Sequence, residues 1–276
     1  MSNNVNGMNR KVLTIVVSVA LLTAALLIYE LPQPSRISST ALTYENYYYQ
    51  LQVPNEEQRV IGIVFDDGWL TQYTAARPIL DEYGFKATFA IITEAPDRRP
   101  AYMSWDQIIA LNNQGHDIES HTVSHLTLTS QDATSIEYEL SQSKQDLIKH
   151  GINAPLFVYP EGKGAGDIDI EKLVQQHYYA ACSINHGSLD MNQPFDPYAI
   201  PRYVVGKTTT MEMFERYVNQ ASDSTIVIIY YHNINNESES TSVTPEAFAA
   251  QMQYLHDNNF TVQTLKQLFT TVAPEK

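Results

Sequence analysis

The sequence is short of cysteine and of positive charge, and both shortages narrow the classes of protein it can belong to. Cys182 is the only cysteine among 276 residues, so no intrachain disulfide can form. There are 17 Lys and Arg residues against 31 Asp and Glu residues, which gives a formal net charge of −14. Nucleic acids and anionic membrane surfaces bind clustered Lys and Arg, so the composition argues against both as partners. The single cysteine leaves the redox compartment undecided, because large extracytoplasmic domains often lack disulfides.

Charge is also absent from one long run near the N-terminus. Arg10 and Lys11 precede Val12–Tyr29, a run of 18 residues without a charged side chain. At about 1.5 Å per residue a helix of this length reaches roughly 27 Å, close to the thickness of a bilayer's hydrocarbon core. The residues after the run offer no good small-x-small cleavage site, so an uncleaved single-pass anchor is favoured over a cleaved signal peptide. With the two basic residues held inside, the rest of the chain is expected outside the cytoplasm; secretion after cleavage is the alternative.

The composition along the chain predicts four parts. These are a cytoplasmic N-terminus (1–11), a transmembrane anchor (12–29), a linker rich in Pro, Ser and Thr (30–54) and one domain (55–272). The last part is long enough for one domain of the larger single-core kind. No internal repeat or low-complexity block is evident.

From Val60 onward, short apolar runs alternate with amphipathic segments, as in a parallel sheet covered by helices. The expected strands are Val60–Phe65, Ala87–Ile92, Asp117–Ser120, Leu156–Tyr159, Ala180–Ile184, Ala199–Val204, Thr225–Tyr231 and Thr261–Val262. The expected helices are Thr71–Tyr83, Ser104–Asn113, Asp132–His150, Ile168–His177, Thr210–Ala221, Thr244–Asn258 and Leu265–Phe269. The alternation predicts an α/β fold, and a barrel of about seven strands is favoured over an open doubly wound sheet.

Several polar residues fall at the C-terminal ends of expected strands, where such barrels place their chemistry. They are Asp66, Asp67, His121, Pro160 and His232. Two adjacent carboxylates and a His-x-x-x-His pair could form a divalent metal site with a spare acid-base group. Each pattern also has an ordinary interpretation, because Asp66-Asp67-Gly68 could cap a turn, and His121 and His125 could be surface or core histidines. Their shared place at strand ends favours the functional interpretation.

The remaining histidines and the cysteine carry less weight. His232 would be read as a core histidine if it stood alone, and it gains significance only by ending a strand beside the other motifs. Thr122 occupies the place of the glutamate in a His-Glu-x-x-His protease helix, which argues against a zinc protease. Cys182 lies in an expected strand without a nucleophile signature, so it is expected to be a buried small hydrophobe.

These motifs occur together in one known family. The residues concerned are Phe65-Asp66-Asp67-Gly68, His121-Thr122-Val123-Ser124-His125, Phe157-Val158-Tyr159-Pro160-Glu161-Gly162 and Tyr230-Tyr231-His232. In their order and spacing, the motifs resemble the polysaccharide deacetylases of carbohydrate esterase family 4, the NodB-homology domain. The resemblance runs from about Val60 to His232 and implies a distorted (β/α) barrel that removes N-acetyl groups from N-acetylglucosamine polymers.

The resemblance also implies roles for individual residues. The implied metal ligands are Asp67, His121 and His125. The implied metal is Zn²⁺, with Co²⁺, Ni²⁺ or Fe²⁺ as alternatives. Asp66 would be the general base for a metal-bound water that attacks the acetyl carbonyl, and His232 would be the general acid. The backbone N–H of Glu161 would stabilise the oxyanion.

Further residues have weaker assignments, and three departures from the family pattern qualify them. Trp69, Tyr159 and Pro160 would line the substrate site. Val158 stands where many members have the arginine that orients the base, and Arg202 is the candidate replacement. Glu161 replaces a more usual aromatic residue, and the aspartate that steadies the acid histidine is not identifiable.

The Tyr-Pro-x-Gly form with a separate arginine is closest to the poly-N-acetylglucosamine deacetylase branch. An N-acetylated glycan is the expected partner, the N-terminal helix supplies the membrane contact, and no protein partner can be inferred. Two other functions stay open. The domain could be a catalytically impaired barrel that binds glycans, or a metal-dependent amidase acting on another acyl amide.

Overall fold

The structure is a computed structural model that describes residues 58–237 and 239–269. The predicted cytoplasmic segment, anchor and linker lie outside the described residues and stay predictions. Among the residues that are described, no helix is long and apolar enough to cross a membrane.

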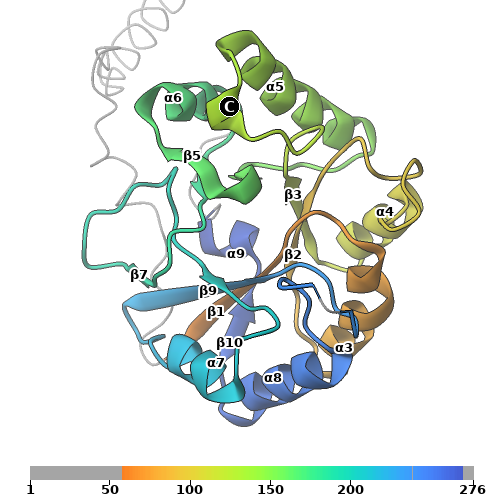
Figure 1. Ribbon diagram of the computed structural model, residues 1–276. Helices are drawn as coiled ribbons and strands as arrows, with labels where there is room; N and C mark the ends of the chain where they lie inside the picture. The colour runs from red at the N-terminus through yellow and green to blue at the C-terminus, as the bar shows by residue number, and fades with distance from the viewer. Residues whose placement is uncertain (1–57, 238, 270–276) are drawn as a thin grey trace, which may run out of the picture. The chain divides into compact units, whose positions relative to one another are not determined.

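A curled, mainly parallel sheet forms the centre of the fold (Figure 1). Its hydrogen-bonded path runs β6-β4-β3-β2-β1-β9-β7, with β10 paired to β1 and β8 paired to β9. The strands on this path, in chain order, are β1 (Val60–Phe65), β2 (Thr88–Ile91), β3 (Asp117–Ser120), β4 (Leu156–Val158), β6 (Ala180–Cys182), β7 (Leu189–Asp190) and β9 (Thr225–Tyr231). The other strands are β5 (Lys163–Gly166), β8 (Tyr203–Val204) and β10 (Thr261–Gln263). On this path β7 runs antiparallel to its neighbour β9.

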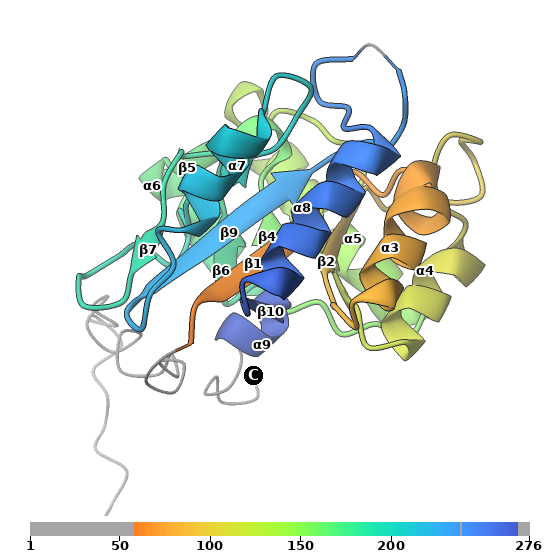
Figure 2. The same ribbon diagram turned by 90° about the horizontal axis from the view of Figure 1, so that it is seen from below.

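Helices follow most strands and lie around the sheet (Figures 1 and 2). They are α3 (Arg77–Glu82), α4 (Trp105–Asn113), α5 (Ala133–Lys149), α6 (Ile168–His177), α7 (Met211–Val218), α8 (Pro245–Asp257) and α9 (Leu265–Phe269). Two helix starts that the sequence predicts are confirmed, because Ser104 and Thr244 each accept a backbone N–H in the first turn. Figure 2 shows α9 at one end of the sheet, opposite the loop that precedes α8.

The segment before β8 draws the two ends of the sheet together. Ile200 forms a parallel bridge with Cys182 of β6, and a few residues later β8 pairs with β9. The chain between β7 and β8 therefore links the β6 edge to β9, and the sheet curls as the predicted barrel requires.

Side chains of the central strand alternate between two hydrophobic clusters, as a strand buried on both faces must. Ile61, Ile63 and Phe65 join the cluster that contains residues of the outer helices. Val60 and Val64 join the cluster that also contains residues of α9. We call this second cluster the inner hydrophobic cluster. Gly62 lies on the same side of the strand as Val60 and Val64, and a Cβ added there would come within 3.1 Å of a side-chain carbon of Ile228.

Two predicted elements differ most clearly from the structure, and β5 and β7 were not predicted. The helix expected over Thr71–Tyr83 begins with a π-helical turn at Gln72–Ala76 and continues as α3. Pro78 has no N–H to donate to the preceding turn, so the regular α-helical ladder is interrupted there. The strand expected over Ala199–Val204 is regular only at Tyr203–Val204, although Ile200 bridges to β6.

One face of β3 holds two neighbouring carboxyl groups, and they yield a pH prediction. Glu119 is fully buried, accepts the backbone N–H of Leu156 at 2.8 Å and lies beside Asp117. Burial and the charge of Asp117 raise the pKa of Glu119 well above its usual value. A group whose pKa is raised in the folded state stabilises the fold below its unfolded pKa of about 4.3, and this contribution is lost as the pH rises toward the folded pKa.

Glu119→Gln removes this titration and keeps a neutral hydrogen-bonding side chain. The free energy of unfolding of the variant, relative to the unmodified protein, is therefore expected to increase from about pH 5 to about pH 8, by on the order of 1 kcal/mol per pKa unit. Urea unfolding at several pH values measures it, with the exposed Glu82→Gln as control. Parallel stability–pH curves for the protein and Glu119→Gln would refute the prediction.

Candidate active site

The adjacent carboxylates take separate directions because the backbone changes conformation between them. The N–H of Asp66 donates to the carbonyl of Tyr231 at 2.9 Å, so Asp66 still continues the β1–β9 ladder. Asp67 has a φ of 79°, in the left-handed region, and Gly68 follows with a φ of 85°. The side chains of Asp66 and Asp67 therefore make different contacts, as the sequence predicts for neighbouring residues at a strand end.

Asp67 lies against two histidines in an arrangement that suits a metal ion. The Nε2 atoms of His121 and His125 are each 3.4 Å from Oδ1 of Asp67. One ligand atom from each of the three residues lies within 4.8 Å of the others. Oδ1 of Asp67 is buried and has no hydrogen-bond partner among the described residues. A shared carboxylate oxygen facing two imidazole nitrogens fits a first-row divalent metal, which binds mixed N and O ligands.

A backbone carbonyl group fixes the protonation of one ring nitrogen of His121. Its Nδ1 lies 2.7 Å from the carbonyl oxygen of Val158 in β4. A carbonyl only accepts, so Nδ1 carries the proton and donates it; in the neutral ring the lone pair is then on Nε2, the nitrogen that faces Asp67. Val158 thus contributes through its backbone, and its side chain belongs to the inner hydrophobic cluster.

Strained backbone is concentrated in the motifs of this site. Six described non-glycine residues have positive φ, and four of them are Asp67, Thr122, His125 and Glu161. Such conformations cost about 1–3 kcal/mol each and persist only where surrounding contacts enforce them. The clustering favours this rim of the sheet as the candidate site.

Asp66 forms a buried ion pair with Arg202, from the segment that precedes β8. Two parallel hydrogen bonds join them, Nη1 to Oδ1 at 2.8 Å and Nη2 to Oδ2 at 3.0 Å. The side chains of Arg202 and Asp66 are 0% and 4% exposed, and Nε of Arg202 also donates to the carbonyl of Ser183. Burial is the largest influence and raises the pKa of Asp66, but the charge of Arg202 and its hydrogen bonds, with the charge of His121, lower it overall. Asp66 is therefore held as a carboxylate, the form that accepts a proton.

His232 directly follows β9 and also lies near Asp67. Its Nε2 is 4.0 Å from Oδ2 of Asp67, and its side chain is 21% exposed. Its Nδ1 is buried and has no hydrogen-bond partner among the residues the structure describes. The aspartate that the sequence lacks at this point is thus not replaced by another described side chain.

The aromatic and turn residues that the sequence assigns to substrate binding occupy different environments. Trp69 donates from Nε1 to Oδ2 of Asp67 at 2.7 Å and stacks on Tyr102 with ring centroids 4.3 Å apart. Tyr159 is fully buried and packs with Phe157 in a hydrophobic cluster. Its position does not favour a contact with substrate, because the ring lies in the core.

The turn after β4 places Glu161 at the rim with its side chain outside. Pro160 is buried, and Glu161 has a φ of 53° in a short 3₁₀ turn, Pro160–Gly162. The Glu161 carboxylate accepts from Oγ1 of Thr127 at 3.0 Å and pairs with Lys163 at 2.8 Å. The side chain is therefore tied to its neighbours, and any oxyanion contact would come from the backbone.

Sequence reasoning missed residues that act through hydrogen bonds to the motifs. Gln72 is fully buried, and its Nε2 donates to the carbonyls of Asp66 and His232, which ties the ends of β1 and β9 together. Glu139 of α5 binds the turn between the two histidines. A polar residue on the buried side of a helical pattern was the available signal for both. Cys182 is buried as predicted, and burial raises the pKa of its thiol to about 12, which argues against a thiolate nucleophile.

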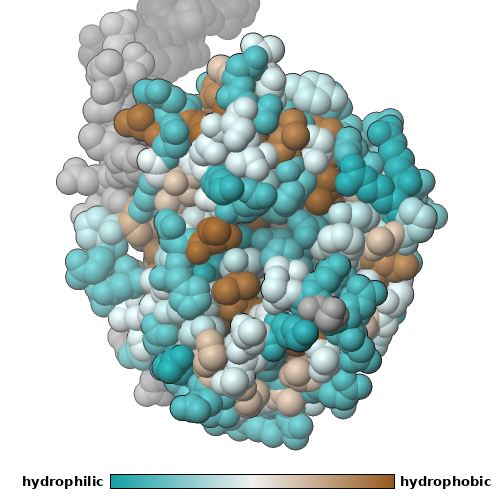
Figure 3. Space-filling model, viewed as in Figure 1, coloured by the Kyte–Doolittle hydropathy of each residue, from teal (hydrophilic) through white to brown (hydrophobic). Residues whose placement is uncertain are grey.

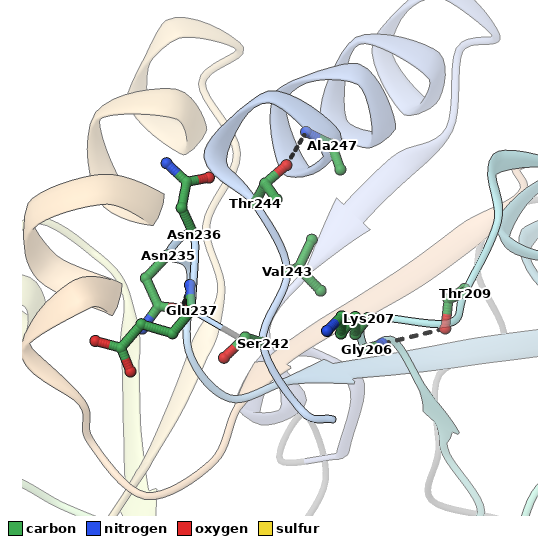
Figure 4. Close-up of a pocket in the computed structure, with 10 residues that line it drawn as sticks. All are labelled: Gly206, Lys207, Thr209, Asn235, Asn236, Glu237, Ser242, Val243, Thr244 and Ala247. Carbon is green, nitrogen blue, oxygen red and sulfur yellow. Dashed lines mark hydrogen bonds between the residues drawn. The ribbon is translucent and has the colours of Figure 1, made fainter. Parts of the chain in front are cut away.

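A separate pocket of about 250 Å³ lies next to the ends of β8 and β9 (Figure 4). Its lining comes from the segment after β8, the segment after β9 and the start of α8, where Thr244 caps the helix. The residues are Gly206, Lys207, Thr209, Asn235, Asn236, Glu237, Ser242, Val243, Thr244 and Ala247. None of the candidate metal ligands or acid-base residues is among them, so this pocket is distinct from the candidate metal site.

The face of the molecule in Figure 3 has a mixed polar and apolar surface. On the face shown in Figure 3, the described hydrophobic residues are scattered among hydrophilic ones and do not gather into one broad patch. Scattered apolar residues are normal for a solvated surface, whereas a broad patch would point to an apolar partner.

The fold and this site together define a class: α/β enzymes with a curled parallel sheet and a candidate metal centre at the C-terminal strand ends. Residues 54–181 match the family model described as "Polysaccharide deacetylase". The matched segment, 128 of the 276 residues, thus resembles the polysaccharide deacetylases, a family of enzymes, as the motifs predicted.

Known relatives agree with this assignment. The chain is 31% identical over 108 residues to a Bacillus subtilis protein provisionally named the polysaccharide deacetylase YxkH, and this covers 38% of each. It is 30% identical over 116 residues to the peptidoglycan-N-acetylglucosamine deacetylase of Bacillus cereus, covering 42% of this chain and 51% of the relative. The chain thus spans about half or less of the length of these relatives.

A solved structure extends the likeness of the fold beyond the matched segment. The peptidoglycan N-acetylglucosamine deacetylase Bc1960 superposes with a TM-score of 0.58 at 15% identity, covering 84% of this chain and 97% of that one. At this identity the likeness supports the fold alone, and it shows that the curled sheet is that of the deacetylases.

Proposed function

We propose that this protein is a metal-dependent N-deacetylase that hydrolyses N-acetyl groups of a polysaccharide containing N-acetylglucosamine. One observation carries the proposal. Ligand atoms of Asp67, His121 and His125 lie close together, the Asp66–Arg202 pair adjoins Asp67 in the chain, and His232 lies 4.0 Å from Asp67. The resemblance to this family and the names of the relatives support the same activity.

The arrangement distributes the work of amide hydrolysis among separate residues. A divalent metal, when bound by Asp67, His121 and His125, supplies a Lewis acid for a reaction that neutral water performs poorly. Asp66 takes a proton from the attacking water, since Arg202 keeps it ionised.

The remaining groups act on the intermediate and the leaving group. The backbone N–H of Glu161 donates to the developing oxyanion, and a good donor of this kind contributes about 3 kcal/mol. His232 donates a proton to the amine nitrogen as the C–N bond breaks, because an unprotonated amine leaves poorly. The products are acetate and a free amino sugar.

The proposal is tested by acetate release from N-acetylglucosamine oligomers with the full-length purified protein. We expect a chelator to abolish release and an added divalent metal to restore it, because neutral water attacks an amide slowly without Lewis-acid help. His125→Ala should lose metal and activity, whereas His186→Ala, an exposed histidine outside the cluster, should keep both. Absence of acetate release with every first-row divalent metal tried would refute the proposal.

Two other functions make different predictions in the same assay. A glycan-binding barrel without activity is motivated by the unpartnered Nδ1 of His232, and it predicts binding of oligomers without acetate release. An amidase for another acyl amide predicts faster release from acylated amino compounds than from acetylated sugars. Within the proposed activity, we expect poly-N-acetylglucosamine to be a better substrate than peptidoglycan fragments, and the reverse order would place the protein outside that branch.

A further inference from the structure

One face of α5 holds the rim of the metal site. Glu139, Ser143 and Asp146 are spaced four and three residues apart, so they lie on the same side of the helix. Each binds a different segment of the rim. Ser143 meets Ser120 at the end of β3 at 2.8 Å, and Asp146 accepts from Oγ1 of Thr93 after β2 at 3.0 Å.

Of the three, Glu139 makes the most contacts with the rim, and all of them are with the turn between the two metal-ligand histidines. Its Oε2 accepts the backbone N–H groups of Val123 and Ser124, both at 2.9 Å. Its Oε1 accepts from Oγ of Ser124 at 2.6 Å. Glu139 is 3% exposed, so these bonds form away from bulk water, where charge-assisted hydrogen bonds are strong.

This turn is one that the chain would not adopt unaided. Thr122 and His125 have φ values of 67° and 65°, and Thr122 is β-branched, a residue type for which positive φ is a genuine outlier. The carbonyls of Thr122 and Val123 accept from the N–H groups of Thr93 and Glu94. Glu139 binds the N–H groups on the other side, so the turn is held from both directions.

The two histidines depend on this turn to different degrees. His121 is fixed by its strand-end backbone bond to Ile91 and by the bond from Nδ1 to Val158. His125 has a side chain that is 32% exposed, and its N–H donates to Oγ1 of Thr122 within the turn. A shift of the turn would therefore move His125 away from Asp67 and leave His121 in place.

We infer that Glu139 is a positioning residue that sets the place of His125 relative to Asp67 and His121, and through it the affinity and geometry of the metal site. This role rests on the metal centre of the proposed function. Glu139 is not one of the three candidate metal ligands.

The chain offers a matched control on the same helix. Glu137 lies two residues away, and its side chain pairs with His177 at 2.8 Å, on the side of α5 that faces α6. We compare Glu139→Gln and Glu139→Ala with Glu137→Gln in the full-length protein. Metal affinity is measured by competition with a chromophoric chelator, and coordination by the visible absorption of the Co²⁺ form.

We expect Glu139→Gln to weaken metal binding by about 10- to 100-fold, as removal of groups that orient metal ligands typically does, and Glu139→Ala to weaken it at least as much. The Co²⁺ spectrum of Glu139→Gln should change, because a displaced imidazole alters the coordination geometry. Glu137→Gln should keep the affinity and spectrum of the unmodified protein.

The outcomes separate the role of Glu139 from the proposed function. Unchanged affinity and spectrum in Glu139→Gln, with or without a loss of thermal stability, would overturn the positioning role and leave the metal site intact. No metal binding by the unmodified protein would overturn the metal centre itself. If Glu139→Ala fails to fold, Glu139→Gln, which keeps the size and one acceptor oxygen, decides the question.

Discussion

Asp66→Asn is expected to lower acetate release by about a thousandfold while the protein keeps its metal. A positioned general base contributes roughly 10²- to 10⁴-fold, and the amide of asparagine has the shape of the carboxylate without its basicity. Asp66 is not among the grouped metal ligands, so metal content should not change. The measurement is the initial rate of acetate release from N-acetylglucosamine oligomers, together with metal analysis of the same sample.

A second variant separates loss of the base from loss of the fold. Asp66→Asn leaves the fully buried guanidinium of Arg202 without its anion, which is expected to cost about 3–5 kcal/mol of stability. Combining it with Arg202→Met removes both charges and should recover much of that stability, while activity stays low. Full acetate release by metal-loaded Asp66→Asn would contradict the assignment of the base.

Arg202→Met alone is expected to shift the pH dependence of activity and to destabilise the protein. Without Arg202, burial dominates and raises the pKa of Asp66, so the base becomes protonated at higher pH. The acidic limb of the kcat/KM profile should therefore move to higher pH. Breaking one side of a buried pair is also expected to cost about 3–5 kcal/mol in the free energy of unfolding.

Two further variants sharpen this test. Arg202→Lys keeps the charge but cannot form two parallel hydrogen bonds to the carboxylate. The acidic limb of its kcat/KM profile should therefore lie between that of Arg202→Met and that of the unmodified protein. Arg77→Met is the control, because Arg77 forms a partly exposed pair with Asp81 on a helix surface, where ion pairs contribute little. An acidic limb that stays in place in Arg202→Met would show that Arg202 does not set the ionisation of Asp66.

Much of this fold can be predicted from the sequence, because runs of apolar residues along the chain indicate where the strands lie. The runs at Val60–Phe65 and Thr225–Tyr231 were predicted as strands with the bounds that the structure has. Buried on both faces, they could be recognised from near-continuous apolar character alone. The turn at Gln72–Ala76 could not, because the amphipathic pattern of Thr71–Tyr83 predicts a helix without distinguishing a π-helical turn from an α-helical one.

The candidate metal ligands were also accessible from the sequence. Asp67, His121 and His125 each follow a strand, and parallel strands bring their C-terminal ends to one edge. Arg202 could be named only as a candidate, since 136 positions separate it from Asp66 and the strand that follows it is short. Tyr159 shows the converse case, because a motif neighbour of the site has its ring in the core.

The sequence by itself determined which chemistry is available: the carboxylates of Asp66 and Asp67, the His-x-x-x-His pair and the strand-end His232, in the order of a known family. Only the tertiary structure decided how these groups are held. Three features depend on how distant segments of the described chain meet. They are the ion pair of Arg202 with Asp66, the hydrogen bonds of Glu139 to the turn between the histidines, and the unpartnered Nδ1 of His232. Such contacts follow from the curl of the sheet and the packing of α5, and no local residue pattern encodes them.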